Sequence, residues 1–234
     1  INNYCYNGNA ICSFSFKFRN LYNYSGDSIF GFSQFSTSFL LRNIMTCEVK
    51  VIEDSINPHN EIRVTTLELR YWRAIHSEFM THRVFSRNAS SSRAIPVKTM
   101  IKQVWNNPAM PVYWGKNQAG MKARTELSSF KIALSKFVWI SASKVACIFA
   151  YLLTHIGLHK QVSNRLIEPW QYISVIVTST EWDNFFGLRD HTDAQPEIRE
   201  LAIAMKEAMD QSKPEYRELH LPYISDKEIG RAHV

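Results

Sequence analysis

The chain has 234 residues, of which 45% are hydrophobic, and its formal net charge at pH 7 is +6. A chain of this length and composition can bury a substantial core as one domain, and the positive charge favours anionic partners such as nucleotides or nucleic acid. Its four cysteines lack metal-binding spacing, and the longest apolar run, Val145–Leu153, is too short to cross a membrane. These features argue against a metal site or a membrane protein and indicate a reduced, cytoplasmic one.

Residues 1–44 differ in composition from the rest of the chain. They hold eleven aromatic residues and a single acidic one, Asp27, without the periodicity of a helix or strand. Met45 is the first methionine, and ordinary globular sequence follows it. We expect the native domain to cover residues 45–225, with residues 1–44 a disordered or non-native extension and residues 226–234 a frayed tail. A genuine transit or accessory segment is the alternative.

Two strands are expected first, from Cys47 to Glu53 and from Val64 to Leu69, because both segments alternate apolar and polar residues. The segment from Tyr71 to Met80 has helical spacing, which predicts a helix directly before the most polar stretch of the chain. A short helix from Val97 to Val104 follows, and then a loop over residues 106–120 that contains two prolines and two glycines.

A long helix is predicted from about Thr125 to Ile156, with Gly157 as its stop, and a second one from about His159 to Glu168. Tyr172–Val177 is rich in β-branched residues, which indicates a strand. Pro196 opens the last predicted helix, whose apolar face contains Ile198, Leu201, Ala202, Met205 and Met209. Helices with a few scattered strands predict an α+β domain with a small central sheet packed with helices.

The stretch from Thr81 to Arg93 is the most informative part of the chain. It contains three arginines, a histidine, an asparagine and several serines, with Val84 and Phe85 as its large apolar pair. Such a segment is poor core material, but arginine offers planar donors to phosphate, and serine and asparagine add further hydrogen bonds. A solvated basic loop is the alternative for this stretch taken alone.

The order His82-Arg83, seven residues, Ser91, then Arg93 resembles the Arg-His-Arg-x7-Ser signature of the flavin-dependent thymidylate synthases, with Thr81 at the first arginine. Further elements match in order downstream, over about residues 78–198. Arg165-Leu-Ile-Glu-Pro169 resembles Arg-x-x-Leu-Pro, Asn184-Phe-Phe-Gly-Leu-Arg189 resembles Asn-Phe-Leu-x-Leu-Arg, and Asp193-Ala-Gln-Pro-Glu-Ile198 resembles His-Ala-Gln-x-Glu-Ile.

The chain departs from the family pattern at several positions. Ala89 replaces a glutamate, Ala94 replaces a tyrosine, and Thr178–Thr180 stand where an Asn-x-Arg element contacts flavin. His59 and His76 are the candidates for an upstream histidine that contacts flavin.

The resemblance implies a fold of that family, FAD as cofactor, and reductive methylation of dUMP to dTMP with methylenetetrahydrofolate and NADPH as co-substrates. It also implies a homo-oligomer, a tetramer with shared sites, in which the long apolar helix is one candidate interface. Arg189 would be the catalytic residue, lying against the uracil. The implied dUMP-binding residues are Glu78, Ser90, Ser91, Arg93, Arg165 and Arg189. The implied FAD-binding residues are Thr81, His82, Arg83, Ser86, Asn88 and Asn184.

The cysteines offer no convincing nucleophile, because Cys147 lies in an apolar helical run and the other three lie near or before the expected start. A flavin route therefore fits better than attack by a thiolate. His155 and His159 have the spacing of zinc ligands on a helix, but Gly157 separates them and no metal site is expected. Two alternatives stay open: a basic nucleic-acid-binding protein, and a degenerate family member that binds dUMP without flavin. Nucleic acid is the less favoured partner, because the motif lacks interleaved aromatic residues.

Overall fold

The computed structural model describes residues 46–120 and 122–224. The expectations for residues 1–44 and for the tail after residue 225 lie outside these ranges. The strands are β1 (Cys47–Ile56), β2 (Arg63–Trp72), β3 (Ser86–Ala89), β4 (Tyr172–Ser179) and β5 (Glu215–Tyr216). The helices are η2 (Arg73–Ile75), α1 (His76–Phe79), α2 (Val97–Asn106), α3 (Ser129–His155), α4 (Lys160–Ser163), η3 (Asn164–Trp170), α5 (Asp183–Arg189) and α6 (Pro196–Gln211).

The five strands form one sheet in the order β3-β4-β2-β1-β5. The β1–β2, β2–β4 and β3–β4 pairs are antiparallel, and the short β5 runs parallel to β1. The two strands predicted at the start and the one after Tyr172 are all present, and each extends beyond its predicted end. The α+β prediction is confirmed.

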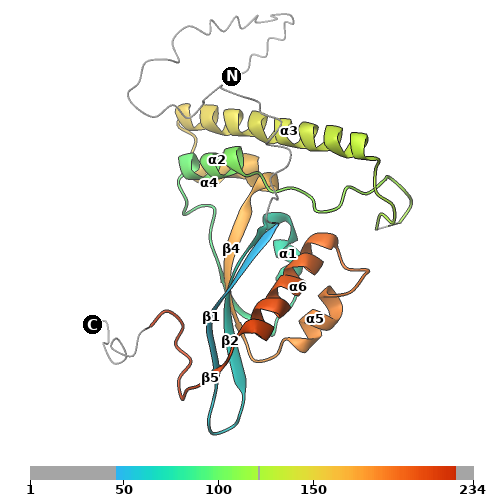
Figure 1. Ribbon diagram of the computed structural model, residues 1–234. Helices are drawn as coiled ribbons and strands as arrows, with labels where there is room; N and C mark the ends of the chain where they lie inside the picture. The colour runs from blue at the N-terminus through green and yellow to red at the C-terminus, as the bar shows by residue number, and fades with distance from the viewer. Residues whose placement is uncertain (1–45, 121, 225–234) are drawn as a thin grey trace, which may run out of the picture. The chain divides into compact units, whose positions relative to one another are not determined.

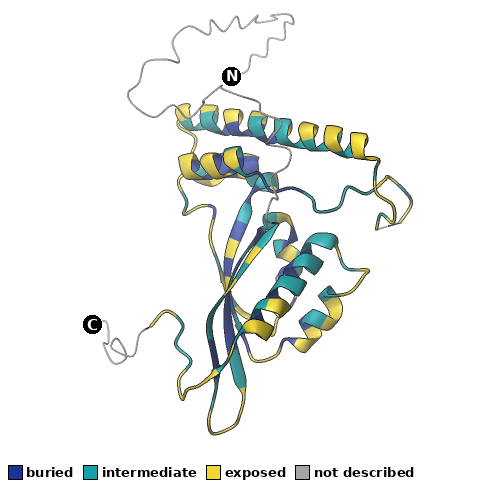
Figure 2. Ribbon diagram, viewed as in Figure 1, coloured by how far each residue is buried: buried dark blue, intermediate teal, exposed yellow. Residues whose placement is uncertain are grey.

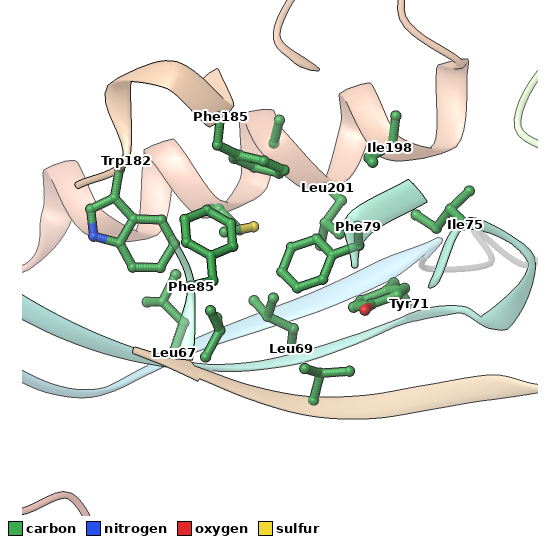
Figure 3. Close-up of a cluster of buried hydrophobic side chains, with 14 of the residues drawn as sticks. Leu67, Leu69, Tyr71, Ile75, Phe79, Phe85, Trp182, Phe185, Ile198 and Leu201 are labelled. Atoms are coloured by element: carbon green, nitrogen blue, oxygen red, sulfur yellow. The ribbon is translucent and has the colours of Figure 1, made fainter. Parts of the chain in front are cut away.

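The main core lies on one face of this sheet, where α5 and α6 cover it (Figure 1). Alternate residues of β2 and β4 point to this face, and the apolar stripe of α6 packs against them (Figure 3). The buried cluster consists of Leu67, Leu69, Tyr71, Ile75, Phe79, Phe85, Ile173, Val175, Val177, Trp182, Phe185, Ile198, Leu201, Ala202, Met205 and Met209. All five apolar residues predicted for the last helix belong to it.

The opposite face of the sheet is polar. Thr66 of β2 and Thr178 of β4 are paired across the strands, and their hydroxyl oxygens lie 2.7 Å apart. His220, from the segment after β5, hydrogen-bonds Thr66 through Nε2 and Ser55 through Nδ1, both at 2.7 Å. The C-terminal segment is therefore tied to this face of the sheet by side-chain hydrogen bonds.

A second, smaller core joins α2, α3 and η3. The packed residues of α3 are small, and Ala146, Cys147 and Ala150 contact the apolar face of α2. The rest of α3 is exposed or half-buried, and many of its exposed side chains are apolar (Figure 2). Its exposed large side chains are Phe130, Leu134, Phe137, Val138, Val145, Ile148, Phe149 and Leu152. The helix predicted over this stretch is confirmed, but only one narrow face of it serves as core.

By length and composition alone, α3 could cross a membrane. The count of uninterrupted apolar residues in the sequence did not detect this, because Lys144 interrupts the run. In the fold, the ammonium of Lys144 lies 4.6 Å from the ring centre of Trp105 on α2. An exposed apolar face is also expected of a helix that packs against another protein chain.

Two predicted helices were wrong in part. Tyr71 and Trp72 continue β2, paired with Ile173 and Tyr172, so the predicted helix shrinks to η2 and α1. Tyr71 has a buried place in the sheet, which overrides its helical spacing. The helix predicted from His159 to Glu168 is divided into α4 and the 3-10 helix η3, which contains Pro169.

Candidate functional site

A cavity of about 780 Å³ lies where the start of the motif meets α5 and the end of α6. Its lining residues are Arg63, Thr81, His82, Arg83, Val84, Phe85, Thr180, Glu181, Trp182, Asp183, Asn184, Phe185, Phe186, Leu188, Arg189, Lys206, Met209 and Asp210. Phe85, Trp182 and Phe185 also belong to the main core, so the cavity is built on a packed floor (Figure 3).

The turn between α1 and β3 carries the motif into this cavity. The hydroxyl of Thr81 donates to the carbonyl of Glu78 at 2.7 Å and closes the end of α1. The guanidinium of Arg87 donates to the carbonyls of Met80, at 2.7 Å, of Phe85, at 3.4 Å, and of His82. Arg87 therefore gathers three backbone oxygens and fixes the shape of the turn that presents His82 and its neighbours.

Arg189, at the end of α5, connects this helix to Glu78 of α1 and to His82 of the motif. Its Nε donates to Nε2 of His82 at 2.9 Å, and its Nη1 forms an ion pair with Glu78. Because a guanidinium can only donate, Nε2 of His82 accepts and the imidazole proton lies on Nδ1. No hydrogen bond engages Nη2 of Arg189 within residues 46–120 and 122–224, so these donors are free for a ligand in the cavity.

His82 is held in its neutral form. Burial, followed by the nearby guanidinium groups of Arg189 and Arg87, lowers its pKa below the ordinary histidine value. In the His82–Arg189–Glu78 group the cation is therefore Arg189, with a neutral imidazole on one side and the Glu78 carboxylate on the other.

Four of the residues expected to bind flavin line the cavity together with Arg189: Thr81, His82, Arg83 and Asn184. Arg83 is exposed and has no ion-pair partner in the described part of the chain. Trp182 has a buried Nε1 with no acceptor among the described residues, which leaves one more donor at the cavity wall.

The serines and Asn88 of the motif are placed elsewhere. Ser86 and Asn88 lie in β3 opposite Thr178 and Ile176 of β4, so they belong to the polar face of the sheet. The N–H of Ser90 donates to the carbonyl of Ser174 at 2.9 Å, which extends this pairing. These residues are not among those that line the cavity.

Arg165 belongs to a further cluster beside η3. Its Nη1 lies 2.9 Å from Oε1 of Glu168, the same oxygen that Arg73 approaches at 3.2 Å. The hydroxyl of Ser92 is 3.5 Å from this carboxylate. Arg165 and the end of the motif are therefore neighbours, joined by the carboxylate of Glu168.

Ser91 and Arg93 are exposed at this end of the motif, and the Ser91 hydroxyl accepts a hydrogen bond from the Arg93 N–H at 3.4 Å. Arg93 and Arg165 do not line the cavity that holds Arg189. A single dUMP site that contains Arg93, Arg165 and Arg189 thus stays a prediction for an assembly of several chains.

Sequence reasoning did not assign roles to Arg73, Arg87 or the carboxylate of Glu168. Arg87 stands inside the motif, four residues after Arg83, where its charge resembled that of a ligand-binding arginine. Glu168 stands at the leucine position of the Arg-x-x-Leu-Pro element, and a carboxylate three residues after Arg165 on a helix is a signal for an ion pair.

The remaining candidate groups have structural contacts. His76 hydrogen-bonds the hydroxyl of buried Tyr71 at 2.9 Å, whereas His59 is exposed on the β1–β2 turn. Burial raises the pKa of both Cys47 and Cys147 to about 11, which disfavours a thiolate at either position. His159 accepts from the N–H of Gln161 and caps α4.

Comparison with known proteins rests on structure. No family model and no curated protein matches the sequence. A UMP/dUMP methylase, PolB from Streptomyces cacaoi, bound with 5-Br UMP, matches with a TM-score of 0.59 and 16% identity, over 70% of this chain and 89% of PolB. Its complex with 5-Br dUMP matches with a TM-score of 0.58 and 15% identity, over 70% of this chain and 90% of PolB. The chain therefore shares the fold of PolB.

Proposed function

We propose that this chain is a flavin-dependent thymidylate synthase that methylates dUMP to dTMP. The observation that carries the proposal is Arg189, held by His82 and Glu78 with free donors in the cavity where the motif meets α5. The fold adds support, because PolB is described as a UMP/dUMP methylase. The motif elements and the fold thus agree on a pyrimidine mononucleotide as substrate.

In this proposal Arg189 acts on the uracil ring. Its free Nη2 would donate to a ring carbonyl, and its positive charge would stabilise the anion left when the ring loses its N3 proton. Glu78 and His82 orient the guanidinium, so its position is set before the substrate arrives. A neutral His82 also avoids a second cation that would repel Arg189.

FAD would be held in the cavity by Thr81, His82, Arg83 and Asn184. The residues present fit such a group, because among the described residues Arg83 has no ion-pair partner and is available to its phosphates, and the buried Nε1–H of Trp182 has no acceptor there. When bound, FAD supplies the hydride and one-carbon transfer chemistry, with methylenetetrahydrofolate as carbon donor and NADPH as reductant. The raised pKa of Cys147 is consistent with a route that does not need a thiolate.

The dUMP phosphate would be held by Arg93 and Arg165 with Ser90 and Ser91, on a different part of the chain from Arg189. A homo-oligomer would join these groups into one site, and by the resemblance it is a tetramer. The exposed apolar face of α3 supports self-association, because a surface of this kind is unfavourable in water and is typical of an interface.

One observation favours a second candidate, a family member that binds dUMP without flavin. Thr178, where the family has a flavin contact, is already engaged by Thr66, which in turn binds His220. The chain's own C-terminal segment therefore occupies hydrogen-bonding groups of this face of the sheet.

The absorbance of the purified protein separates these candidates. We expect bound flavin, or its uptake on incubation with FAD, and a change in the flavin spectrum when dUMP is added. Protein that takes up no FAD but binds dUMP supports the second candidate. Protein that binds neither ligand but retains nucleic acid would refute both.

A further inference from the structure

The cluster beside η3 contains two guanidinium groups that share one carboxylate. Oε1 of Glu168 is 2.9 Å from Arg165 Nη1 and 3.2 Å from Arg73 Nη2, and Oε2 is 3.2 Å from Arg165 Nη1. The hydroxyl of Ser92 lies 3.5 Å from Oε1. The net charge of these groups is +1, because one carboxylate faces two cations.

Buried hydrogen bonds hold the backbone around this cluster. The side-chain N–H groups of Asn164 donate to the carbonyls of Ser92 and Ile95 at 2.7 and 3.1 Å, and Gln171 Nε2 donates to the Asn164 carbonyl at 3.1 Å. The N–H of Arg73 donates to the Gln171 carbonyl at 2.9 Å. Asn164 and Gln171 are fully buried, so their hydrogen bonds hold Ser92 and the backbone of Arg73 in place.

The donors that Glu168 uses are those that a phosphate monoester needs. Planar guanidinium groups bind carboxylate and phosphate oxygens in the same way, and a hydroxyl completes the set. Glu168 is partly exposed, with 23% of its side chain accessible, and Arg165 is 57% accessible. The Arg165–Glu168 ion pair is exposed on the Arg165 side and contributes little stability, so Arg165 can exchange Glu168 for another anion at small cost, whereas Arg73 and Glu168 are each 23% accessible.

Two anions cannot share these donors without repelling each other. An incoming phosphate must therefore displace the carboxylate of Glu168, or bind beside it at a cost. We propose that Glu168 is an internal competitor for the phosphate of the nucleotide, and that it sets the affinity of the chain for phosphate-bearing ligands. This inference rests on the proposed function only for the identity of the nucleotide.

The test compares Glu168→Gln with the wild-type protein, using dUMP, deoxyuridine and inorganic phosphate as probes. Glutamine keeps the size of the side chain and raises the net charge of the cluster from +1 to +2. Glu215→Gln is the matched control, because Glu215, in β5, forms an exposed ion pair with Arg217 and the change removes one carboxylate from it. Isothermal titration gives the affinities, and the shift of the melting temperature in phosphate, against chloride at equal ionic strength, gives a second readout.

We expect Glu168→Gln to bind dUMP roughly tenfold more tightly than either wild type or Glu215→Gln, with deoxyuridine binding unchanged. Phosphate should also stabilise Glu168→Gln more than the control. Equal or weaker binding of dUMP and phosphate by Glu168→Gln would overturn the proposal, since Glu168 would then only orient Arg165. Glu168→Leu, which also removes the charge, serves if the glutamine variant does not fold.

The phosphate probe separates this inference from the proposed function. If no protein binds dUMP but Glu168→Gln gains affinity for phosphate, the competition stands and the proposed function fails. If dUMP binds equally well to all three proteins, the proposed function survives and the role of Glu168 is refuted.

Discussion

Nε of Arg189 lies 2.9 Å from Nε2 of His82, although the two residues are 107 positions apart in the chain. This contact joins the motif after α1 to the last turn of α5, and Glu78 completes it from the other side. The pair requires a neutral imidazole, and the lowered pKa of His82 agrees with that.

Replacing Arg189 with alanine should abolish turnover while the fold persists. The variant loses the cation that stabilises charge on the uracil, which corresponds to a fall in kcat of about 100-fold or more. Arg217→Ala, an arginine that is also ion-paired but lies beyond β5, is the control. Steady-state kinetics and circular dichroism measure the two effects, and near-normal turnover by folded Arg189→Ala would refute its catalytic role.

Arg93→Ala should weaken dUMP binding more than FAD binding. Arg93 is exposed next to Ser91 and is not among the residues that line the cavity with His82 and Asn184. Titration of each ligand against the variant measures the two losses. A larger loss of FAD affinity than of dUMP affinity would mean that the two binding sites are assigned the wrong way round.

Arg87→Ala should destabilise the protein, because the carbonyls of Met80, His82 and Phe85 would lose a charged donor. The expected loss in the free energy of unfolding is about 2 kcal/mol. Arg83→Ala, four residues earlier in the same motif, should leave stability unchanged and weaken FAD binding instead. Urea denaturation of both variants decides, and equal stabilities would show that Arg87 does not hold the turn.

The free energy of unfolding should fall as the pH drops below about 6.5. Burial is the first cause that lowers the pKa of His76, His82 and His220 in the folded protein. In this window the unfolded chain binds more protons than the folded one, so acid favours unfolding. For His220, the Glu53 carboxylate at 4.0 Å acts in the opposite sense but less strongly than burial.

Urea denaturation between pH 8 and pH 5.5 measures this slope. His220→Asn should reduce the slope, because it removes one of the three histidines whose pKa is lowered in the folded protein. A free energy of unfolding that stays constant or rises on acidification would contradict the assignment of neutral histidines.

Self-association should depend on the exposed face of α3. Phe137→Glu places a charge in the middle of that face and should reduce the molar mass measured by light scattering. Ile62→Glu, which adds the same charge at an exposed apolar residue just before β2, is the control. An oligomer that survives Phe137→Glu unchanged would place the interface on another surface.

The sequence predicted those elements in which local pattern and tertiary packing agree. The alternation in β1 and β2 and the apolar stripe of α6 each produced the expected element, because the same residues that set the period also fill the core. Trp72 shows the limit: its spacing of three residues to Ile75 is helical, but pairing with Tyr172 across the sheet decides its conformation.

Part of the lining of the cavity could be predicted from one short segment of the sequence. Thr81, His82 and Arg83 line the cavity as neighbours in sequence, and Asn184 and Arg189 join them across the fold. The role of Arg87 could not be inferred, since its partners are backbone oxygens that any sequence possesses. The ion pair between Glu168 and Arg73 depends on where the end of β2 lies relative to η3. No local sequence pattern encodes that position.

The formation of dTMP tests the central claim most directly. Purified protein supplied with FAD, NADPH and isotopically labelled methylenetetrahydrofolate should convert dUMP to dTMP that carries the label, as detected by mass spectrometry, and Arg189→Ala should not. Unlabelled dUMP recovered in full from folded, FAD-loaded protein would contradict the proposed function.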